Sequence, residues 1–164
     1  MLRRIDPSFE PRREGDFRAV NRDGFMVDLI TPAPRDIMRV RPPKRLGNAP
    51  ADMTAMEVEK LQWLVEAPRF EAMAIAENGL PVHMVVADPR FFAAHKLWLA
   101  ERPDRERVKR DRDRQQALAV AALLAGPLAT ADHGDAALTQ LPMPLRDGLR
   151  QALAAAPAPE PPVW

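Results

Sequence analysis

The sequence predicts an α+β domain in which a mixed sheet packs against flanking helices. Two turn signals, Asp23-Gly24 and Asn78-Gly79, each separate a pair of β-prone segments, as expected for two hairpins. Helix signals follow the second hairpin, because Asp88-Pro89 is typical of a helix start and Gly126-Pro127 of a helix end. The chain has 164 residues, which is enough for one hydrophobic core.

The first half of the chain combines strand signals with irregular segments. Residues 1–16 are rich in charge and proline and are expected to form an extended lead-in. Residues 17–21 and 25–31 are predicted strands, and the second, apolar on both faces except at Asp28, is expected in the interior of a sheet. Residues 32–52 carry five prolines and a basic cluster, which predicts a long surface loop.

Helices are expected to dominate the second half. Residues 53–66 lack glycine and proline and are predicted to be helical. After the hairpin of residues 71–76 and 80–86, two long helices are predicted at 89–101 and 108–125. The expected organisation is therefore a lead-in, a main domain, a short helical extension and a disordered proline-rich tail, at residues 1–16, 17–126, 127–155 and 156–164.

Composition excludes several classes of function. The chain has no cysteine, so disulfides, thiolate catalysis and cysteine-ligated metal centres are excluded. Its only serine, Ser8, lacks the glycine-flanked context of a hydrolase nucleophile. A net charge of +1 argues against a general nucleic-acid coat. The longest apolar run is far shorter than the roughly 20 residues that span a bilayer, and no signal peptide is recognisable, so we expect a cytoplasmic protein.

Asp28 is the first candidate functional residue. A carboxylate within an apolar strand is costly unless a cation, a hydrogen-bond donor or a metal compensates it. Two interpretations remain open at this stage: a metal-binding carboxylate on an active-site strand, or an aspartate near a strand end that pairs with an arginine.

The two predicted long helices supply the other candidates. A helical projection places His95 among aromatic side chains, where it either fills the core or faces a cleft, and Lys96 at the edge of that face. In the next helix, Lys109 and Asp113 are four residues apart on the expected core-facing side. This pair either stabilises the helix or holds a lysine in place for phosphate binding.

Three ordered segments resemble a known family. They are Asp23-Gly24-Phe25-Met26-Val27-Asp28-Leu29-Ile30, then Asp88-Pro89-Arg90-Phe91-Phe92-Ala93-Ala94-His95-Lys96-Leu97, then Glu101-Arg102-Pro103 followed by Lys109-Arg110-Asp111-Arg112-Asp113. This set is similar to bacterial nucleotidyltransferase-fold proteins of the minimal or antitoxin type, relatives of the polymerase β superfamily. The resemblance covers about a hundred residues, 23–125.

The resemblance implies a mixed sheet with flanking helices and two Mg²⁺ ions held by three carboxylates. Asp28 matches the third of these carboxylates, which would make it a catalytic metal ligand. Lys96, Lys109 and Asp113 match positions in the helical part of the family, where the lysines are expected to meet the phosphates of a bound NTP. Such an enzyme transfers a nucleoside monophosphate from the NTP to an acceptor.

The sequence departs from the family pattern in one respect. No glycine is followed by serine or glycine, and no Asp-x-Asp precedes Asp28. We therefore expect the C-terminal part of a nucleotidyltransferase fold, truncated, followed by a helical part, and inactive alone. The alternative is a non-enzymatic, antitoxin-like or regulatory module that binds nucleic acid or a protein partner through the basic loop of residues 35–45 and the exposed arginines of the last long helix. Self-association is compatible with either hypothesis.

Overall fold

The computed structural model describes residues 2–34, 41–49, 51–128 and 135–157 of the chain. These residues form two compact units, Met1–Gln62 and Trp63–Trp164. The boundary falls inside residues 17–126, which the sequence pattern predicts to form one domain. Strands and helices both contribute, which confirms the predicted α+β class.

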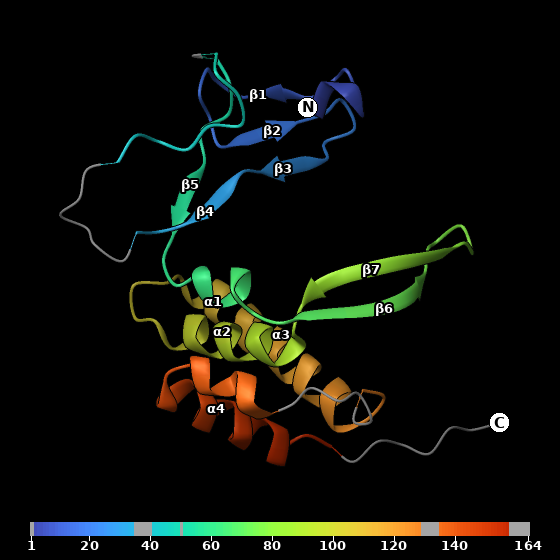
Figure 1. Ribbon diagram of the computed structural model, residues 1–164, viewed down its shortest axis with the longest axis vertical. Helices are drawn as coiled ribbons and strands as arrows, with labels where there is room; N and C mark the ends of the chain where they lie inside the picture. The colour runs from blue at the N-terminus through green and yellow to red at the C-terminus, as the bar shows by residue number, and fades with distance from the viewer. Residues whose placement is uncertain (1, 35–40, 50, 129–134, 158–164) are drawn as a thin grey trace. The chain divides into compact units, whose positions relative to one another are not determined.

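The first unit is built from short strands (Figure 1). An antiparallel sheet has the order β1-β2-β3, and a separate parallel pair joins β4 to β5. Gly24, with φ of +81°, makes the predicted turn between β2 and β3. The bounds are β1 (Glu10–Pro11), β2 (Arg18–Val20), β3 (Met26–Asp28), β4 (Ile30–Pro32) and β5 (Met56–Val58), with a 3₁₀ helix at Leu2–Arg4. The small core of the first unit contains Phe9, Ala19 and Met53.

The second unit begins with the end of a short helix, followed by a hairpin and then by longer helices (Figure 1). The predicted hairpin is confirmed, with antiparallel β6 and β7 joined through Gly79 at φ of +80°. The elements are the end of α1 (Gln62–Val65), β6 (Arg69–Ile75), β7 (Pro81–Ala87), α2 (Pro89–Glu101), α3 (Arg107–Ala125), a 3₁₀ helix at Asp135–Gln140 and α4 (Met143–Ala154). None of the helices in these described residues combines the length and apolarity needed to cross a bilayer.

Local chemistry explains why α2 begins where it was predicted to begin. The Asp88 side chain accepts a hydrogen bond of 2.8 Å from the backbone N–H of Arg90, and Pro89 occupies the first helical position. The Asp88 carboxylate also accepts a 2.6 Å bond from Nη2 of the Arg90 guanidinium, so this buried acid is fully compensated.

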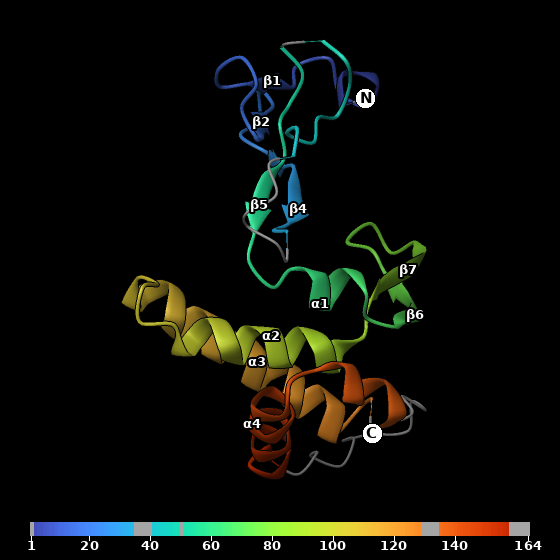
Figure 2. The ribbon, with the colours of Figure 1, turned by 60° about the vertical axis from the view of Figure 1, so that its left-hand side comes forward.

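The core of the second unit lies where α2, α3 and α4 meet (Figure 2). Alanines without any exposed surface line the faces of α2 and α3, which lets the two helices approach closely. They are Ala93, Ala94, Ala117 and Ala121. Larger apolar side chains, Phe91, Leu141 and Leu149, fill the space toward α4 and the segment before it.

Three sequence expectations need correction. Residues 53–66 are not one helix, because Met56–Val58 pairs with β4 as strand β5 and only Gln62–Val65 is helical. Residues 1–16 are more than a lead-in, since they supply β1 and the core residue Phe9. The strand that carries Asp28 is not interior: β3 is at the edge of its sheet, and the apolar run continues into β4 of another sheet. For β5, pairing with the distant strand β4 overrode the local helical pattern.

The core assignment predicts the effect of truncating Leu149, which is 1% exposed. Leu149→Ala removes apolar contact and leaves a cavity, so the free energy of unfolding should fall by about 3 kcal/mol. Urea unfolding followed by far-UV circular dichroism measures this change. Leu118→Ala is the matched control, because Leu118 is 46% exposed on α3, and it should change stability by less than about 0.5 kcal/mol. Equal losses in the two variants would contradict the assignment.

Candidate functional site

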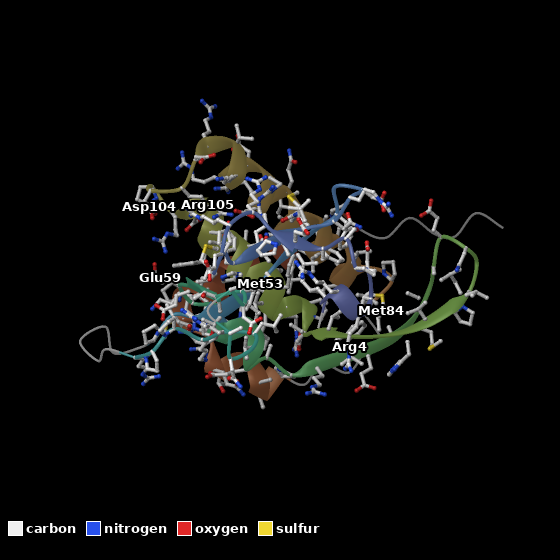
Figure 3. The ribbon with its side chains drawn as sticks, turned by 90° about the horizontal axis from the view of Figure 1, so that it is seen from above. Arg4, Met53, Glu59, Met84, Asp104 and Arg105 are labelled. Carbon is white, nitrogen blue, oxygen red and sulfur yellow. The ribbon has the colours of Figure 1, made fainter. Side chains whose placement is uncertain are left out.

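A buried carboxylate with two cations is the main charged constellation of the second unit. Asp113 on α3 has no exposed surface. Its Oδ1 accepts a hydrogen bond of 2.9 Å from Nζ of Lys96 on α2, and its Oδ2 accepts one of 2.6 Å from Nε of Arg105. We call these three residues the Asp113 cluster. It joins α2, α3 and the connection between them, where Arg105 follows Asp104 (Figure 3).

The Asp113 cluster carries a net positive charge. Burial alone would raise the pKa of Asp113, but hydrogen bonds from Lys96 and Arg105 outweigh it and hold the pKa below the ordinary value. The carboxylate is therefore ionised at neutral pH and balances one of the two cations. The side chains of Lys96 and Arg105 keep 18% and 26% of their surface exposed, so the remaining positive charge faces solvent.

Aromatic side chains contact the cations near the C-terminal end of α2. The Lys96 ammonium lies 5.4 Å from the centre of the Phe92 ring, and the Arg102 guanidinium lies 4.8 Å from the centre of the Trp98 ring. Arg102 also donates two hydrogen bonds, of 2.8 and 2.6 Å, to Asp104. These contacts restrict the rotamers of long side chains, so the cations are positioned before any ligand arrives.

The predicted pairing of Lys109 with Asp113 is not the pairing that forms. Lys109 is about half exposed and binds Glu106 at 2.9 Å, whereas Asp113 binds Lys96 and Arg105. Lys109 was expected on the core-facing side of α3 together with Asp113, but the buried face follows Asp113, Ala117, Ala121 and Leu124 and leaves Lys109 outside it. Sequence reasoning missed Arg105, since this residue lies in a connection that has no periodicity.

His95 is a second unusual group on α2. The residue is 4% exposed, and its ring stacks on Trp98 with 5.8 Å between centroids and meets Trp63 edge-on at 6.3 Å. Neither ring nitrogen has a hydrogen-bond partner among the described residues. Burial, reinforced by the positive charge of Lys96, lowers the pKa of His95 from 6.5 to about 4. His95 is therefore a neutral core residue at neutral pH, one of the two roles expected for it.

Asp28 lies in the first unit, directly opposite Arg18 across the β2–β3 pair. Both of its oxygens accept hydrogen bonds of 2.6 Å from the guanidinium, which lowers the pKa of Asp28. The side chain is 35% exposed. This geometry matches the interpretation of an aspartate near a strand end that pairs with an arginine.

The resemblance implies two Mg²⁺ ions, and the described residues show whether enough oxygen ligands are present to bind them. Hard cations such as Mg²⁺ prefer several oxygen ligands, and a two-metal centre needs several carboxylates together. In the part of the chain that the structure describes, no group of three histidine, aspartate or glutamate residues could hold a metal ion. A metal at Asp28 would also have to displace Arg18. The described residues therefore do not fit a two-metal centre.

The low pKa of His95 predicts a pH-dependent stability. The unfolded ring has the higher pKa, so between pH 6.5 and about 4 the unfolded chain binds more protons, and stability falls as pH falls through this window. From about pH 7.5 to about pH 5, the free energy of unfolding should decrease by about 2 kcal/mol. Urea unfolding followed by tryptophan fluorescence measures the decrease.

Two variants separate His95 from other groups. His95→Phe cannot take up a proton and should remove this decrease, while His83→Gln, at an exposed position on β7, should retain it. A decrease that persists unchanged in His95→Phe would show that the buried ring does not control the pH dependence.

Comparison with models of known protein families identifies a family for this chain. A family model described as nucleotidyltransferase matches residues 1–141. Neither the curated proteins nor the solved structures contain a significant match to the chain. The matched span includes the Asp113 cluster, Asp28 and His95, and it extends on both sides of the 23–125 segment on which the resemblance was based. Since the family model matches most of the chain, the chain belongs to the nucleotidyltransferase family.

Proposed function

We propose that this protein binds the triphosphate of an NTP at the Asp113 cluster, as part of the nucleotidyl transfer that its family performs. The observation that carries the proposal is the buried Asp113 carboxylate, which fixes Lys96 and Arg105 through bonds of 2.9 and 2.6 Å. Positioned cations are what transfer of a nucleotidyl group requires, because negative charge builds up on the phosphate oxygens in the transition state.

The donors of the cluster suit phosphate oxygens. An ammonium group has three N–H donors and a guanidinium has five. Asp113 accepts from one donor of Lys96 and from the Nε–H of Arg105, so further donors of both groups can reach a ligand. Lys109, one turn before Asp113 and about half exposed, is proposed as an additional phosphate contact. In this proposal Asp113 orients the two cations and does not touch the nucleotide itself.

The described residues do not supply a complete Mg²⁺ centre, because no group of three histidine, aspartate or glutamate residues among them could hold a metal ion. Asp28 is proposed as one metal ligand only in a state in which Arg18 has released it. The printed sequence contains no Gly-Ser pair and no Asp-x-Asp before Asp28. We therefore propose that the 164-residue chain binds nucleotide but does not catalyse transfer alone.

A specific surface supports the second candidate function, an antitoxin-like or regulatory module. In the first half of α3, Arg112, Arg114 and two further exposed cations stand against one exposed acid, Asp111, so positive charge dominates the exposed face of this part of the helix. Such a face suits a nucleic acid or an acidic protein, and binding would weaken as salt is raised. The basic loop invoked for the same function lies partly outside the described residues, at 35–40.

Nucleotide binding tests the proposed site. Isothermal titration with each of the four common NTPs at low salt should detect binding, and Arg105→Gln should weaken it at least ~10-fold, because a charge-assisted hydrogen bond to phosphate is lost. Arg107→Gln is the matched control, since Arg107 is two residues away, 87% exposed and paired with Asp111. Equal affinity for Arg105→Gln and the wild-type chain would refute the site, as would equal losses in both variants.

Incorporation of labelled nucleotide tests the proposed inactivity. The purified chain, supplied with Mg²⁺, labelled NTP and a mixture of protein and RNA acceptors, should give no product above the level of a boiled sample. Label transfer that Asp28→Asn abolishes would overturn this prediction and would identify Asp28 as a metal ligand. Asp111→Asn, on the exposed face of α3, controls for general effects of removing a carboxylate.

A further inference from the structure

A cavity of about 560 Å³ lies in the second unit, away from the Asp113 cluster. It is bounded by the start of α2, the 3₁₀ helix at Asp135–Gln140 and one face of α4. None of its lining residues belongs to the Asp113 cluster. Its volume is within the range typical of small-molecule sites. The lining residues are Arg90, Ala136, Leu138, Thr139, Arg146, Leu149, Arg150 and Leu153.

The α4 wall of the cavity has alternating chemistry. Arg146, Leu149, Arg150 and Leu153 are spaced i, i+3, i+4 and i+7, so they share one face of the helix. Two guanidinium groups and two leucines therefore point toward the same space. A ligand that satisfies both kinds of side chain has an anionic group and an apolar body.

The charges around the cavity are unequally compensated. Arg90 pairs with Asp88 at 2.6 Å, and Arg150 pairs with Asp147 at 2.8 Å. Arg146 has no ion pair among the described residues, and its Nε is buried without a hydrogen-bond partner there. A buried N–H without an acceptor is costly. An anion in the cavity would supply the missing acceptor.

We propose that this cavity binds a small amphipathic organic anion, whose carboxylate or phosphate accepts hydrogen bonds from Arg146 and Arg150 and whose apolar part packs on Leu138 and Leu153, the partly exposed leucines of the lining. The guanidinium of Arg146 suits this ligand because its planar donors match the paired oxygens of either anionic group. Plain phosphate would leave the leucine-lined part of the cavity unfilled. This site is separate from the proposed nucleotide site and does not depend on it.

Fluorescence titration with dansylglycine tests the proposal, since this probe combines a carboxylate with an aromatic body. Emission should rise on binding to the wild-type chain, and Arg146→Gln should weaken binding at least ~10-fold. Arg69→Gln, which removes an exposed arginine of β6, is the control and should bind as the wild type does. Dansylamide, which lacks the carboxylate, should bind at least ~10-fold more weakly than dansylglycine.

Competition identifies the anionic group. Octanoate and octyl phosphate should displace dansylglycine, and the stronger competitor shows whether a carboxylate or a phosphate is preferred. Displacement by inorganic phosphate at the same concentration would overturn the assignment of an amphipathic ligand. Absence of dansylglycine binding up to about 1 mM, or equal binding by Arg146→Gln, would overturn the site itself.

Thermal unfolding separates a binding role of Arg146 from a structural one. If Arg146 is held ready for a ligand, Arg146→Gln should melt at or above the temperature of the wild-type chain, because an uncompensated buried donor is removed. A clear fall in the melting temperature of Arg146→Gln would mean that the guanidinium stabilises the fold, and it would contradict the proposal.

Discussion

The ion pairs of Asp113 are the constraint on which the helical unit depends. A carboxylate without exposed surface is tolerated only because Lys96 and Arg105 donate to it from two other parts of the chain. The same bonds fix how α3 lies against α2, and the small alanines of both helices permit the close approach that the bonds need. The acid is therefore buried by the packing, and the cations that compensate it stay partly exposed.

This arrangement also determines the state of His95. The ring is adjacent in sequence to Lys96 and is buried between Trp63 and Trp98, so a proton on it would add a third positive charge near a cluster that already has an excess. A neutral imidazole is compatible with both the aromatic packing and the neighbouring cations. The histidine and the lysine of the His95-Lys96-Leu97 sequence thus have opposite environments, one in the core and one at the surface.

Local signals in the sequence predicted those parts of the fold that local chemistry decides. Gly24 and Gly79 adopt the positive φ that their turns require, and Asp88 caps α2 as expected. Strand β5 was missed because its pairing with β4 spans more than twenty residues and no local pattern encodes it. The candidate site likewise has one residue that local sequence signals identify and one that they do not. Asp113 was recognised from its place on a helix, whereas its partner Arg105 could be found only in three dimensions.

Asp28 and Asp113, the two acids identified from the sequence, differ in how much positive charge their partners leave uncompensated. Arg18 occupies both oxygens of Asp28, so that pair is neutral and presents no free charge. Asp113 is shared between two cations, so its cluster keeps one positive charge and unused donors at the surface. A polyphosphate is attracted by the second arrangement and not by the first. The difference between the two acids therefore lies in the charge and the hydrogen-bond donors that their partners leave at the surface: none at Asp28, and unused donors of Lys96 and Arg105 at Asp113.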